Sequence, residues 1–492
     1  MIIKTDPSEF QNYLVDASNV RGNCDAVCFP ETEDEIVEII KEANEKKIQV
    51  TISGNGTGLT GGRTPNGGIV IATDKLNKVL EINSDEKYAL VETGVILEEF
   101  QKIVDEKNLL YPPDPTERNC FLGATIATNA SGAKSFKYGA TRAFVDGLRI
   151  VLPDGEVIYL ERNKNFVTDS KVVIRSESGK DILIEMPEYK TPDLKNSAGY
   201  YNKSGMDIID LFIGCEGTLG IITQAKLRLI AKPDDVLSSV VFFKEEQNAL
   251  DFISKARTLT QHKPDESTLI DALGLEFFDE KSLRFLSTDF PNIPLYAKAA
   301  VWFEQEITGD SQETLFEAWI ELISEFNGDD ENSWFAFNEK EREKFKDFRH
   351  SVSYKVNEFI SSRNLTKVGT DFAVPHTSFN EFYYYAKSKV EEANINYLAY
   401  GHFGDSHIHL NMLPEDKDQF VKAKEIYLHL CERVIELNGT ISAEHGIGKL
   451  KRDYLLKMYG EENIKKMASI KKSLDPNLIL NIGNMIDPVY LK

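Results

Sequence analysis

The sequence is short of cysteine, of positive charge and of long apolar segments, and each shortage excludes a class of protein. Five cysteines among 492 residues are too few and too scattered for a disulfide framework. Lys and Arg total 57 against 79 Asp and Glu, and the resulting charge of −22 argues against nucleic acid and anionic membrane surfaces as partners. No stretch approaches the roughly 18 uncharged apolar residues that cross a bilayer, and the start MIIKTDPSEF has no signal-peptide pattern. We therefore expect a cytoplasmic protein that is not transmembrane, with peripheral membrane contact left open.

What is present is typical of a globular chain with several domains. Hydrophobic residues make up 41% and charged residues 28%, which excludes disordered and fibrous classes. The first 230 residues combine glycine-rich stretches with short apolar runs. Predicted strands at 26–30 and 48–53 flank a helix at 32–46, giving a β-α-β unit. From about residue 235, long charged helical stretches alternate with strands such as 299–304, which predicts a second, α+β domain.

The first glycine-rich loop, SGNGTGLTGG at 53–62, contains a G-x-G-x-x-G pattern that is misleading. The dinucleotide fingerprint needs a helix to open at its third glycine. Here Pro65 and an Asn66-Gly67 turn lead into another strand, so we reject a nicotinamide-binding Rossmann motif. The P-loop pattern also fails, because Arg63 stands where lysine is needed. So many bare backbone N–H groups still favour a phosphate cradle over a plain tight turn.

Two further loops have the same small-residue character. Residues 111–155 include the stretch GATIATNASG, and residues 214–223 read GCEGTLGIIT with glycines at the entry to a strand. Each loop alone is compatible with a turn. Three such loops in one α/β region predict a long, flat, phosphate-bearing ligand.

These three loops resemble the FAD-binding domain of the vanillyl-alcohol oxidase class, known as the PCMH type. More narrowly, the chain from about 25 to 486 resembles the FAD-linked D-2-hydroxyacid dehydrogenases, which include D-lactate dehydrogenase, the glycolate oxidase catalytic subunit and D-2-hydroxyglutarate dehydrogenase. The resemblance implies an α+β fold with an FAD-binding domain of two α/β subdomains at 1–232, carrying a polar insertion at about 160–205. It implies a substrate-capping α+β domain with an antiparallel sheet at 233–430, and a C-terminal helical segment at 431–492 that returns to the FAD domain.

The resemblance also implies which residues contact FAD. The family's flavin contacts fall on Ser53, Gly54, Asn55, Gly56, Thr57, Gly58, Pro113, Asp114, Thr116, Gly123, Thr128, Asn129, Gly132 and Ile222. Some relatives attach FAD to a histidine in the first loop. This sequence has no histidine there, so we expect FAD to be bound non-covalently.

Five of the eight histidines fall in a short C-terminal window. YGHFGDSHIHLNML (400–413) carries His402, His407 and His409, and a strand starting near Ser406 would place His407, His409 and Asn411 on one face. A lone histidine is more often a satisfied core residue. Several imidazoles with flanking glycines, followed downstream by a carboxylate, favour a transition-metal site.

The resemblance makes this expectation more specific. It assigns His402, His409 and Glu444 as ligands of a divalent metal, with zinc as the first expectation and iron or manganese as alternatives. It assigns His445 as the catalytic base and Asn411 as a substrate contact. The relatives have asparagine or another small polar residue where His407 stands, so an extra ligand and a supporting hydrogen-bond donor both stay open for that histidine.

The segment FRHSVSYKV (348–356) predicts the group that binds the substrate acid. Arg349 and Ser353 lie four apart, hence on one helix face, and a guanidinium offers the fork that a carboxylate fits. A surface ion pair is the plainer alternative for Arg349. Relatives that use dicarboxylates carry a lysine where Gly369 stands here, and Lys367 is offset by two. This difference from the dicarboxylate-using relatives argues against 2-hydroxyglutarate as the substrate. It leaves lactate, glycolate or another small acid open as the substrate.

The resulting expectation is a metal-assisted, FAD-dependent oxidation of a D-2-hydroxy acid to the 2-keto acid. Arg349 acts in catalysis by pairing with the acid, His445 takes the hydroxyl proton, and electrons leave to a separate acceptor: a quinone, a cytochrome or an electron-transfer flavoprotein. Enzymes specific for D-2-hydroxyglutarate or glycolate stay open, as do a non-catalytic flavoprotein subunit and a metal-dependent hydrolase. A homodimer is also left open.

Overall fold

The computed structural model describes residues 1–263, 268–309, 311–363 and 367–492, and it divides into two compact units. Unit 1 comprises residues 1–131, 140–232 and 444–492, and unit 2 comprises 132–139 and 233–443. The division after residue 232 coincides with the expected boundary. Unit 2 runs past the expected end at residue 430, because the helix α11 (Lys417–Glu436) packs on the helix α10 (His376–Glu392) of the same unit.

Unit 1 begins with a four-stranded sheet and the helix predicted beside it. The strand order is β1 (Ile2–Lys4), β2 (Ala26–Phe29), β4 (Ile69–Ala72) and β3 (Val50–Ser53), with the last three parallel. Helix α1 (Glu33–Lys46) is capped by the Thr32 side chain, which accepts from the Glu35 N–H at 3.3 Å. Its buried face consists of Ile36, Ile39, Ile40 and Ala43, which recur at helical spacing.

A second, fully antiparallel sheet completes the framework of unit 1. Its strand order is β5 (Val79–Asn83), β6 (Tyr88–Glu92), β12 (Ile221–Arg228), β8 (Val145–Val151) and β9 (Val157–Glu161). The shorter elements are α2 (Leu97–Asp105), α3 (Leu122–Thr128), α5 (Ile209–Phe212), the pair β7 (Leu109–Leu110) and β13 (Ile230–Ala231), and the hairpin β10 (Lys171–Arg175) and β11 (Asp181–Glu185) within the predicted insertion.

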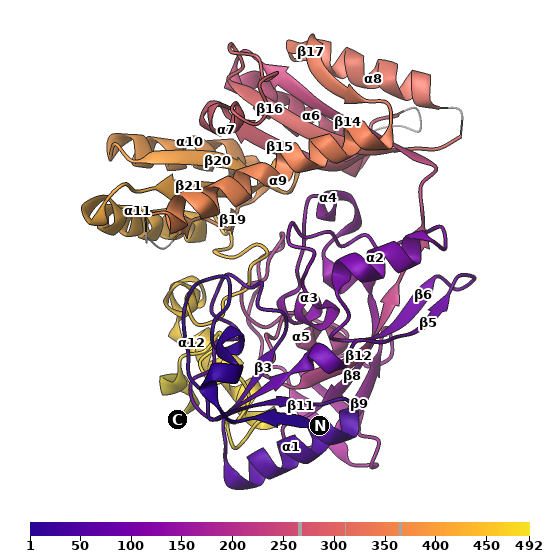
Figure 1. Ribbon diagram of the computed structural model, residues 1–492, viewed down its shortest axis with the longest axis vertical. Coiled ribbons are helices and arrows are strands. Elements are labelled where there is room, and N and C mark those ends of the chain that lie inside the picture. Colours follow the sequence, from indigo (N-terminus) through magenta and orange to yellow (C-terminus); the bar gives the residue numbers. More distant parts are fainter. Residues whose placement is uncertain (264–267, 310, 364–366) are drawn as a thin grey trace. The chain divides into compact units, whose positions relative to one another are not determined.

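The C-terminal segment of unit 1 returns to the first sheet, as Figure 1 shows by the yellow ribbon beside the indigo strands. Helix α12 (Arg452–Leu474) has a break at Gly460 and leads to residues 479–481, which lie along β3. The Val50 N–H donates to the Ile479 carbonyl at 2.7 Å, and the Asn481 N–H donates to the Val50 carbonyl at 2.8 Å. The chain's last residues therefore stabilise the strand that enters the first glycine loop.

Unit 2 is built on an eight-stranded antiparallel sheet. Its strand order is β17 (Gly328–Ala336), β14 (Asp235–Phe243), β16 (Ala299–Ile307), β15 (Ala272–Asp279), β20 (Asn396–Gly401), β21 (His407–Leu413) and β18 (Val368–Gly369), and β19 (Phe372–Ala373) also pairs with β21. Its other helices are α4 (Ser135–Tyr138), α6 (Glu246–His262), α7 (Glu280–Leu286), α8 (Gln312–Glu325) and α9 (Glu339–Ser361). Apolar residues of α7, α9 and the sheet form an aromatic-rich core that includes Trp302 and Phe348.

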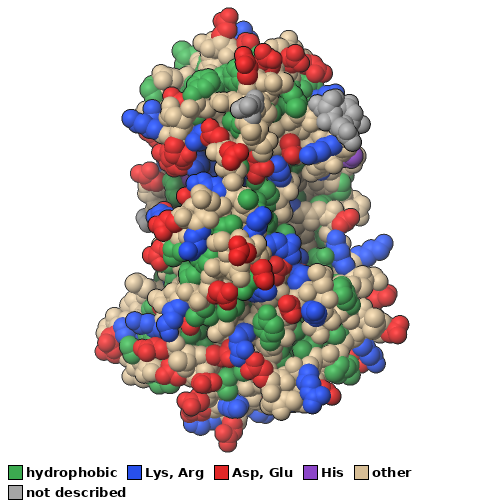
Figure 2. Space-filling model, turned by 90° about the vertical axis from the view of Figure 1, so that its right-hand side faces the viewer, with side chains coloured by type: hydrophobic (Ala, Val, Ile, Leu, Met, Phe, Trp, Pro, Cys, Tyr) green, Lys and Arg blue, Asp and Glu red, His purple; other side chains and the backbone are tan. Residues whose placement is uncertain are grey.

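Six short 3-10 helices complete the described structure: η1 (Pro7–Glu9), η2 (Gln11–Leu14), η3 (Thr73–Lys75), η4 (Thr141–Phe144), η5 (Phe403–Asp405) and η6 (Pro488–Leu491). On the face drawn in Figure 2, acidic and basic side chains are interspersed over most of the surface. Among the described helices, none has the length and apolar character needed to cross a membrane.

Candidate functional site

The first glycine loop of unit 1 leaves the end of β3 and folds over a half-buried arginine, Arg63. Gly56 and Gly61 have φ of +79° and +72°, values that glycine adopts without strain. A Cβ at Gly56 would lie 2.1 Å from Arg63 Nη2, so a side chain there would displace the guanidinium. A Cβ at Gly54 would lie 3.0 Å from the Ala124 Cβ, which shows how closely this loop approaches α3. The glycines are required by close packing as well as by backbone conformation.

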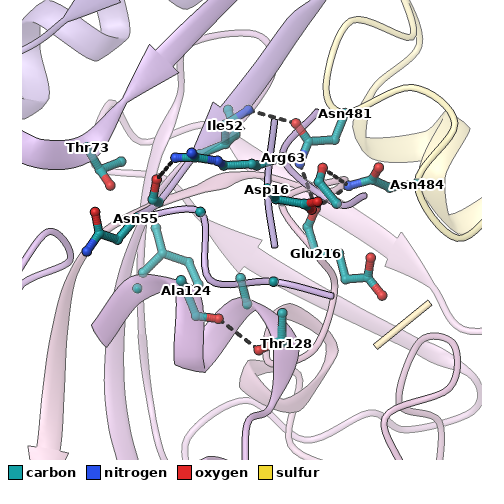
Figure 3. A pocket seen from close by; sticks show the side chains of 18 of the residues that line it. Asp16, Ile52, Asn55, Arg63, Thr73, Ala124, Thr128, Glu216, Asn481 and Asn484 are labelled. Carbon is teal, nitrogen blue, oxygen red and sulfur yellow. Dashed lines mark hydrogen bonds between the residues drawn. The ribbon is translucent and has the colours of Figure 1, made fainter. Parts of the chain in front are cut away.

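Arg63 holds the loop by hydrogen bonds to backbone carbonyls, and it is drawn across the pocket in Figure 3. Its Nη1 donates to the Gly54 carbonyl at 2.7 Å and to Ser53 Oγ at 3.2 Å, and its Nε donates to the Val15 carbonyl at 3.0 Å. Burial lowers the pKa of this guanidinium. A guanidinium stays charged at any pH of interest, so the loop carries a fixed positive charge suited to an anionic group.

The second small-residue segment forms helix α3 and its C-terminal turn. A Cβ at Gly123 would lie 2.4 Å from the Thr93 Cβ, so only glycine lets this helix pack against the end of β6. Thr128 Oγ1 donates to the Ala124 carbonyl at 3.0 Å, so the Thr128 hydroxyl is hydrogen-bonded within helix α3. Asn129 ends the helix with φ of +50°, and its Oδ1 accepts from the Arg142 N–H at 3.0 Å.

The third loop places a buried carboxylate, Glu216, beneath the C-terminal segment. Its two oxygens accept the Ile447 N–H at 2.6 Å and the Gly448 N–H at 2.7 Å. Asn481 Nδ2 donates to the Glu216 carbonyl at 2.7 Å, and Asn481 Oδ1 accepts the Ile52 N–H at 2.8 Å (Figure 3). Burial raises the pKa of the Glu216 carboxyl. Through Asn481 and Glu216, segments from the beginning, middle and end of the chain are tied together.

The three loops surround one pocket in unit 1 with about 890 Å³ of empty space, counting the part open to solvent. The lining includes these residues expected to contact FAD: Gly54, Asn55, Gly56, Thr57, Gly58, Gly123, Thr128 and Ile222. His445, the expected base, lies in the same wall. Ser53, Pro113, Asp114, Thr116, Asn129 and Gly132 are expected contacts outside the lining, and Gly132 belongs to unit 2.

Two of the expected contacts outside the lining, Asp114 and Pro113, have hydrogen-bond partners within the chain. Asp114 forms a two-pronged ion pair with Arg118, at 2.8 and 2.9 Å. The Pro113 carbonyl accepts from Gln101 Nε2 at 3.2 Å. These bonds fix the loop between β7 and α3. They thereby help to position α3, the small-residue helix that lines the pocket.

Asp16 is a pocket residue that the sequence patterns did not single out. Its Oδ1 accepts the Ser18 N–H at 3.0 Å, whereas its buried Oδ2 has no hydrogen-bond partner among the described residues. Burial raises the pKa of this carboxyl. A buried polar atom without a partner is costly, and a hydroxyl of a bound ligand would satisfy it.

The two residues Glu444 and His445 begin the C-terminal part of unit 1. Glu444 Oε2 accepts from Ser131 Oγ at 3.0 Å and from Lys195 Nζ at 2.9 Å. Lys195 is the first residue of the sequence KNSAGY (195–200). Its side chain is only 8% exposed. An ammonium group therefore fixes one carboxylate oxygen of Glu444 in unit 1.

In unit 2, three histidines meet at the turn from β20 into β21. Their ring centroids lie 5.1 Å apart for His402 and His407, 5.5 Å for His402 and His409, and 4.5 Å for His407 and His409. The predicted alternation along β21 is confirmed, since Ile408, Leu410 and Met412 are fully buried in the core. Gly401 has φ of +133°, and a Cβ there would lie 3.2 Å from the His409 ring. Glycine at this corner lets His402 turn back toward His409.

Arg349 joins this cluster through a carboxylate that the sequence motifs did not reveal. Glu276 Oε1 accepts from His402 Nδ1 at 2.6 Å, and its Oε2 lies 3.8 Å from Arg349 Nη1. The Arg349 guanidinium also stands over the Trp302 ring, 5.4 Å from its centroid. Ser353, one helical turn on, contacts the Tyr400 hydroxyl at 3.1 Å. The structure thus groups Arg349, Ser353 and the histidines within unit 2.

Asn411 follows the histidines on the same face of β21 and lacks partners for its side chain. It is 1% exposed, and neither atom of its amide has a hydrogen-bond partner among the described residues. A Cβ at Gly369 would lie 2.2 Å from Asn411 Oδ1 and 3.1 Å from Lys367 Cε. Burial lowers the pKa of Lys367 to about 8. Lys367 therefore brings its side chain to the place that a side chain at position 369 would occupy.

The functional residues missed by sequence reasoning are mostly charged residues at isolated positions. Glu276 interrupts the apolar strand ALGLEFF, and Glu216 interrupts a glycine-rich run. A lone carboxylate in a buried strand is a usable signal, because charged residues are almost never fully buried without a partner. The identity of that partner is not readable from such a signal.

Comparisons with known proteins agree with this architecture. Residues 24–161 match a family described as "FAD binding domain", and residues 233–485 match "FAD linked oxidases, C-terminal domain". Among solved structures, a 4-ethylphenol oxidase from Gulosibacter chungangensis superposes with a TM-score of 0.70 at 18% identity, covering 98% of this chain and 94% of that one. This likeness supports the predicted PCMH-type FAD-binding fold with a second α+β domain.

Two proteins of known name align over most of their length. The D-lactate dehydrogenase of Anaerostipes hadrus is 29% identical, with 92% of this chain and 87% of that protein covered. The glycolate oxidase subunit GlcD of Bacillus subtilis is 30% identical, with 94% and 88% covered. The chain belongs to the FAD-linked oxidases, as an FAD-linked oxidoreductase of the family of D-lactate dehydrogenase, GlcD and D-2-hydroxyglutarate dehydrogenase.

Proposed function

We propose that this protein oxidises a D-2-hydroxy acid to the 2-keto acid with FAD bound non-covalently in the pocket of unit 1. One observation carries the proposal: His445 lies in the wall of the same pocket that the three glycine-rich loops surround. A titratable imidazole beside a flavin site is the arrangement that proton removal during hydride transfer requires. The family places the reaction among flavin-linked oxidations.

The residues of unit 1 fit FAD. The glycines leave room for a pyrophosphate against bare N–H groups, and the Arg63 guanidinium lies next to Gly54 and Gly56. The Asp16 Oδ2 atom is a buried acceptor suited to a ligand hydroxyl. Among the described residues that line the pocket there is no cysteine, and the first loop contains no histidine, which supports non-covalent binding.

The residues of unit 2 fit a divalent metal. The ring nitrogens of His402 and His409 belong to a group of candidate ligand atoms within 4.8 Å of one another. Each imidazole also donates to an acceptor: His402 to Glu276, and His409 Nδ1 to the Thr370 carbonyl at 3.2 Å. Such acceptors orient metal-binding histidines. We retain Glu444 as the carboxylate ligand that the sequence resemblance implies. Zinc is the metal we expect first, with iron or manganese as alternatives.

The roles of the side chains follow from their chemistry. Arg349 binds the substrate carboxylate, since its guanidinium offers two parallel donors in a nearly buried setting. His445 accepts the proton of the C2 hydroxyl as general base. FAD, when bound, supplies the acceptor for the two electrons and the C2 hydrogen. A divalent metal, when bound, supplies Lewis acidity toward the substrate oxygens. Electrons then leave to a separate acceptor of the quinone, cytochrome or electron-transfer flavoprotein kind.

Asn411 and Gly369 bear on which acid is used. The buried amide of Asn411 offers a donor and an acceptor to a small polar substrate. Because Asn411 Oδ1 occupies the space beside Gly369, a lysine at position 369 is not accommodated in this arrangement. A monocarboxylate of the lactate type is therefore our first expectation, with glycolate and D-2-hydroxyglutarate as alternatives.

The test is formation of 2-keto acid in the presence of an artificial electron acceptor. We expect turnover with D-lactate, and an Arg349→Lys variant that retains FAD but raises KM at least tenfold, because lysine loses the two-pronged carboxylate contact. Lys344 is exposed on the same helix, so Lys344→Met is the matched control and should not change KM. Absence of any keto acid from D-lactate, glycolate and D-2-hydroxyglutarate alike would refute the proposed reaction.

A further inference from the structure

The histidine that the sequence left open, His407, lies between the two expected metal ligands. It begins β21, its side chain is fully buried, and its N–H donates to the His402 carbonyl at 3.2 Å. Candidate ligand atoms of His402, His407 and His409 all lie within 4.8 Å of one another. All three belong to unit 2. The chain therefore brings three imidazoles, rather than two, to one place.

Each of the three rings uses one nitrogen to bond to a fixed acceptor. His402 Nδ1 bonds to Glu276 at 2.6 Å and His409 Nδ1 to the Thr370 carbonyl at 3.2 Å, and His407 Nε2 bonds to Asp371 Oδ1 at 3.0 Å. A neutral imidazole that donates from one nitrogen carries its lone pair on the other. His407 is thus held in the same manner as the two histidines already proposed as ligands, with Nδ1 as its ligand atom.

The acceptor of His407 is itself held firmly. Asp371 is 1% exposed, and its Oδ2 accepts from Ser442 Oγ at 2.7 Å. The hydroxyl of the preceding residue, Thr370, forms two hydrogen bonds with β21. It donates to the Ile408 carbonyl at 3.0 Å and accepts the Leu410 N–H at 2.8 Å. A carboxylate that receives one ring N–H of a metal-bound histidine fixes the ring orientation and raises its basicity. Asp371 has the position and support for that role.

From this arrangement we propose that His407 is a metal ligand, so that His402, His407 and His409 form a three-histidine site within unit 2. The inference deepens the proposed function, since it rests on the metal assigned there. Three neutral imidazoles favour zinc, iron, nickel or copper over magnesium or calcium, which prefer oxygen ligands. Asp371 then acts as a positioning residue for His407. The competing arrangement is a protonated His407 that forms an ion pair with Asp371 and binds no metal.

The test measures metal binding by the full-length, FAD-loaded protein after removal of metal by a chelator. Zn²⁺ affinity is measured by competition with a chromophoric chelator, and Co²⁺ is used separately to record the visible ligand-field spectrum. The variants are His407→Asn, His409→Asn and Asp371→Asn. The control is His429→Asn on α11, whose side chain is 64% exposed. Retained FAD absorbance shows that each variant is folded.

We expect His407→Asn to weaken Zn²⁺ binding by a factor similar to that of His409→Asn, at least a thousandfold, and to change the Co²⁺ spectrum. Asp371→Asn should weaken binding by about 10- to 100-fold, as loss of an orienting partner does. A His407→Asn variant with a weakening below 100-fold and an unchanged Co²⁺ spectrum would overturn His407 as a ligand while leaving the other two histidines. A wild-type protein that binds neither ion would overturn the metal in the proposed function itself.

Discussion

Glu216 offers a prediction whose magnitude follows from the structure. Its carboxylate accepts two backbone N–H groups, from Ile447 at 2.6 Å and from Gly448 at 2.7 Å, and the residue is 6% exposed. Hydrogen bonds to charged groups contribute about 1.5–3 kcal/mol each, and a buried donor left without a partner costs a similar amount. Glu216→Ala should therefore destabilise the 446–449 segment by about 3–6 kcal/mol locally.

Hydrogen exchange followed by mass spectrometry measures this local effect directly. A loss of about 3 kcal/mol accelerates exchange of the Ile447 and Gly448 amides roughly a hundredfold, because each 1.4 kcal/mol is a factor of ten. FAD affinity should fall as well, since Glu216 lines the pocket. Glu185→Ala is the control, because the Glu185 side chain is 64% exposed and its pair with Lys171 is a surface ion pair. If Glu216→Ala exchanges these amides within threefold of the wild-type rate, the Glu216 carboxylate does not stabilise this segment.

Two further predictions concern unit 2. Burial raises the pKa of Asp279 from 3.8 to about 6, so the folded state binds this proton more tightly than the unfolded state. The stability that the bound proton gives the folded state is complete below about pH 4 and is lost as pH rises through 6. Because asparagine does not ionise, Asp279→Asn avoids this loss and should be more stable than wild type by up to about 3 kcal/mol at pH 7. The Asn should still cap α7 at the Ser282 N–H, and thermal melts at pH 4 and 7 that show no pH-dependent difference would contradict this. Lys367→Met should leave the KM for D-lactate within twofold of wild type but raise any KM for D-2-hydroxyglutarate, because Lys367 Cε lies beside Gly369 and Asn411. Equal changes in the two KM values would contradict this role of Lys367.

The parts of the fold that could be predicted from the sequence depend on local signals. The Thr32 capping bond and the buried face of α1 follow from residue spacing within one helix. The alternation of His407 and His409 with core residues follows from strand periodicity. The positive φ at Gly401, which lets His402 reach the same place, is not marked by any such spacing.

The supporting carboxylates of the site could not be predicted, because their partners are remote in the chain. Glu276 and His402 are separated by 126 positions, and Glu216 and Ile447 by 231. No periodicity links such residues, and only the sheet order places β15 beside β20. The C-terminal boundary differed for a similar reason, since the helical pattern of α11 does not reveal that it packs on α10.

In the proposed reaction this chain passes electrons from a D-2-hydroxy acid to its own flavin. The most direct measurement is the absorbance near 450 nm (roughly, for any flavin) of the purified protein, mixed without oxygen with D-lactate and, in parallel, with L-lactate. We expect a yellow protein that is bleached by the D acid and not by the L acid, and a His445→Gln variant that stays yellow with both. A protein without flavin absorbance, or one that no D-2-hydroxy acid bleaches, would contradict it.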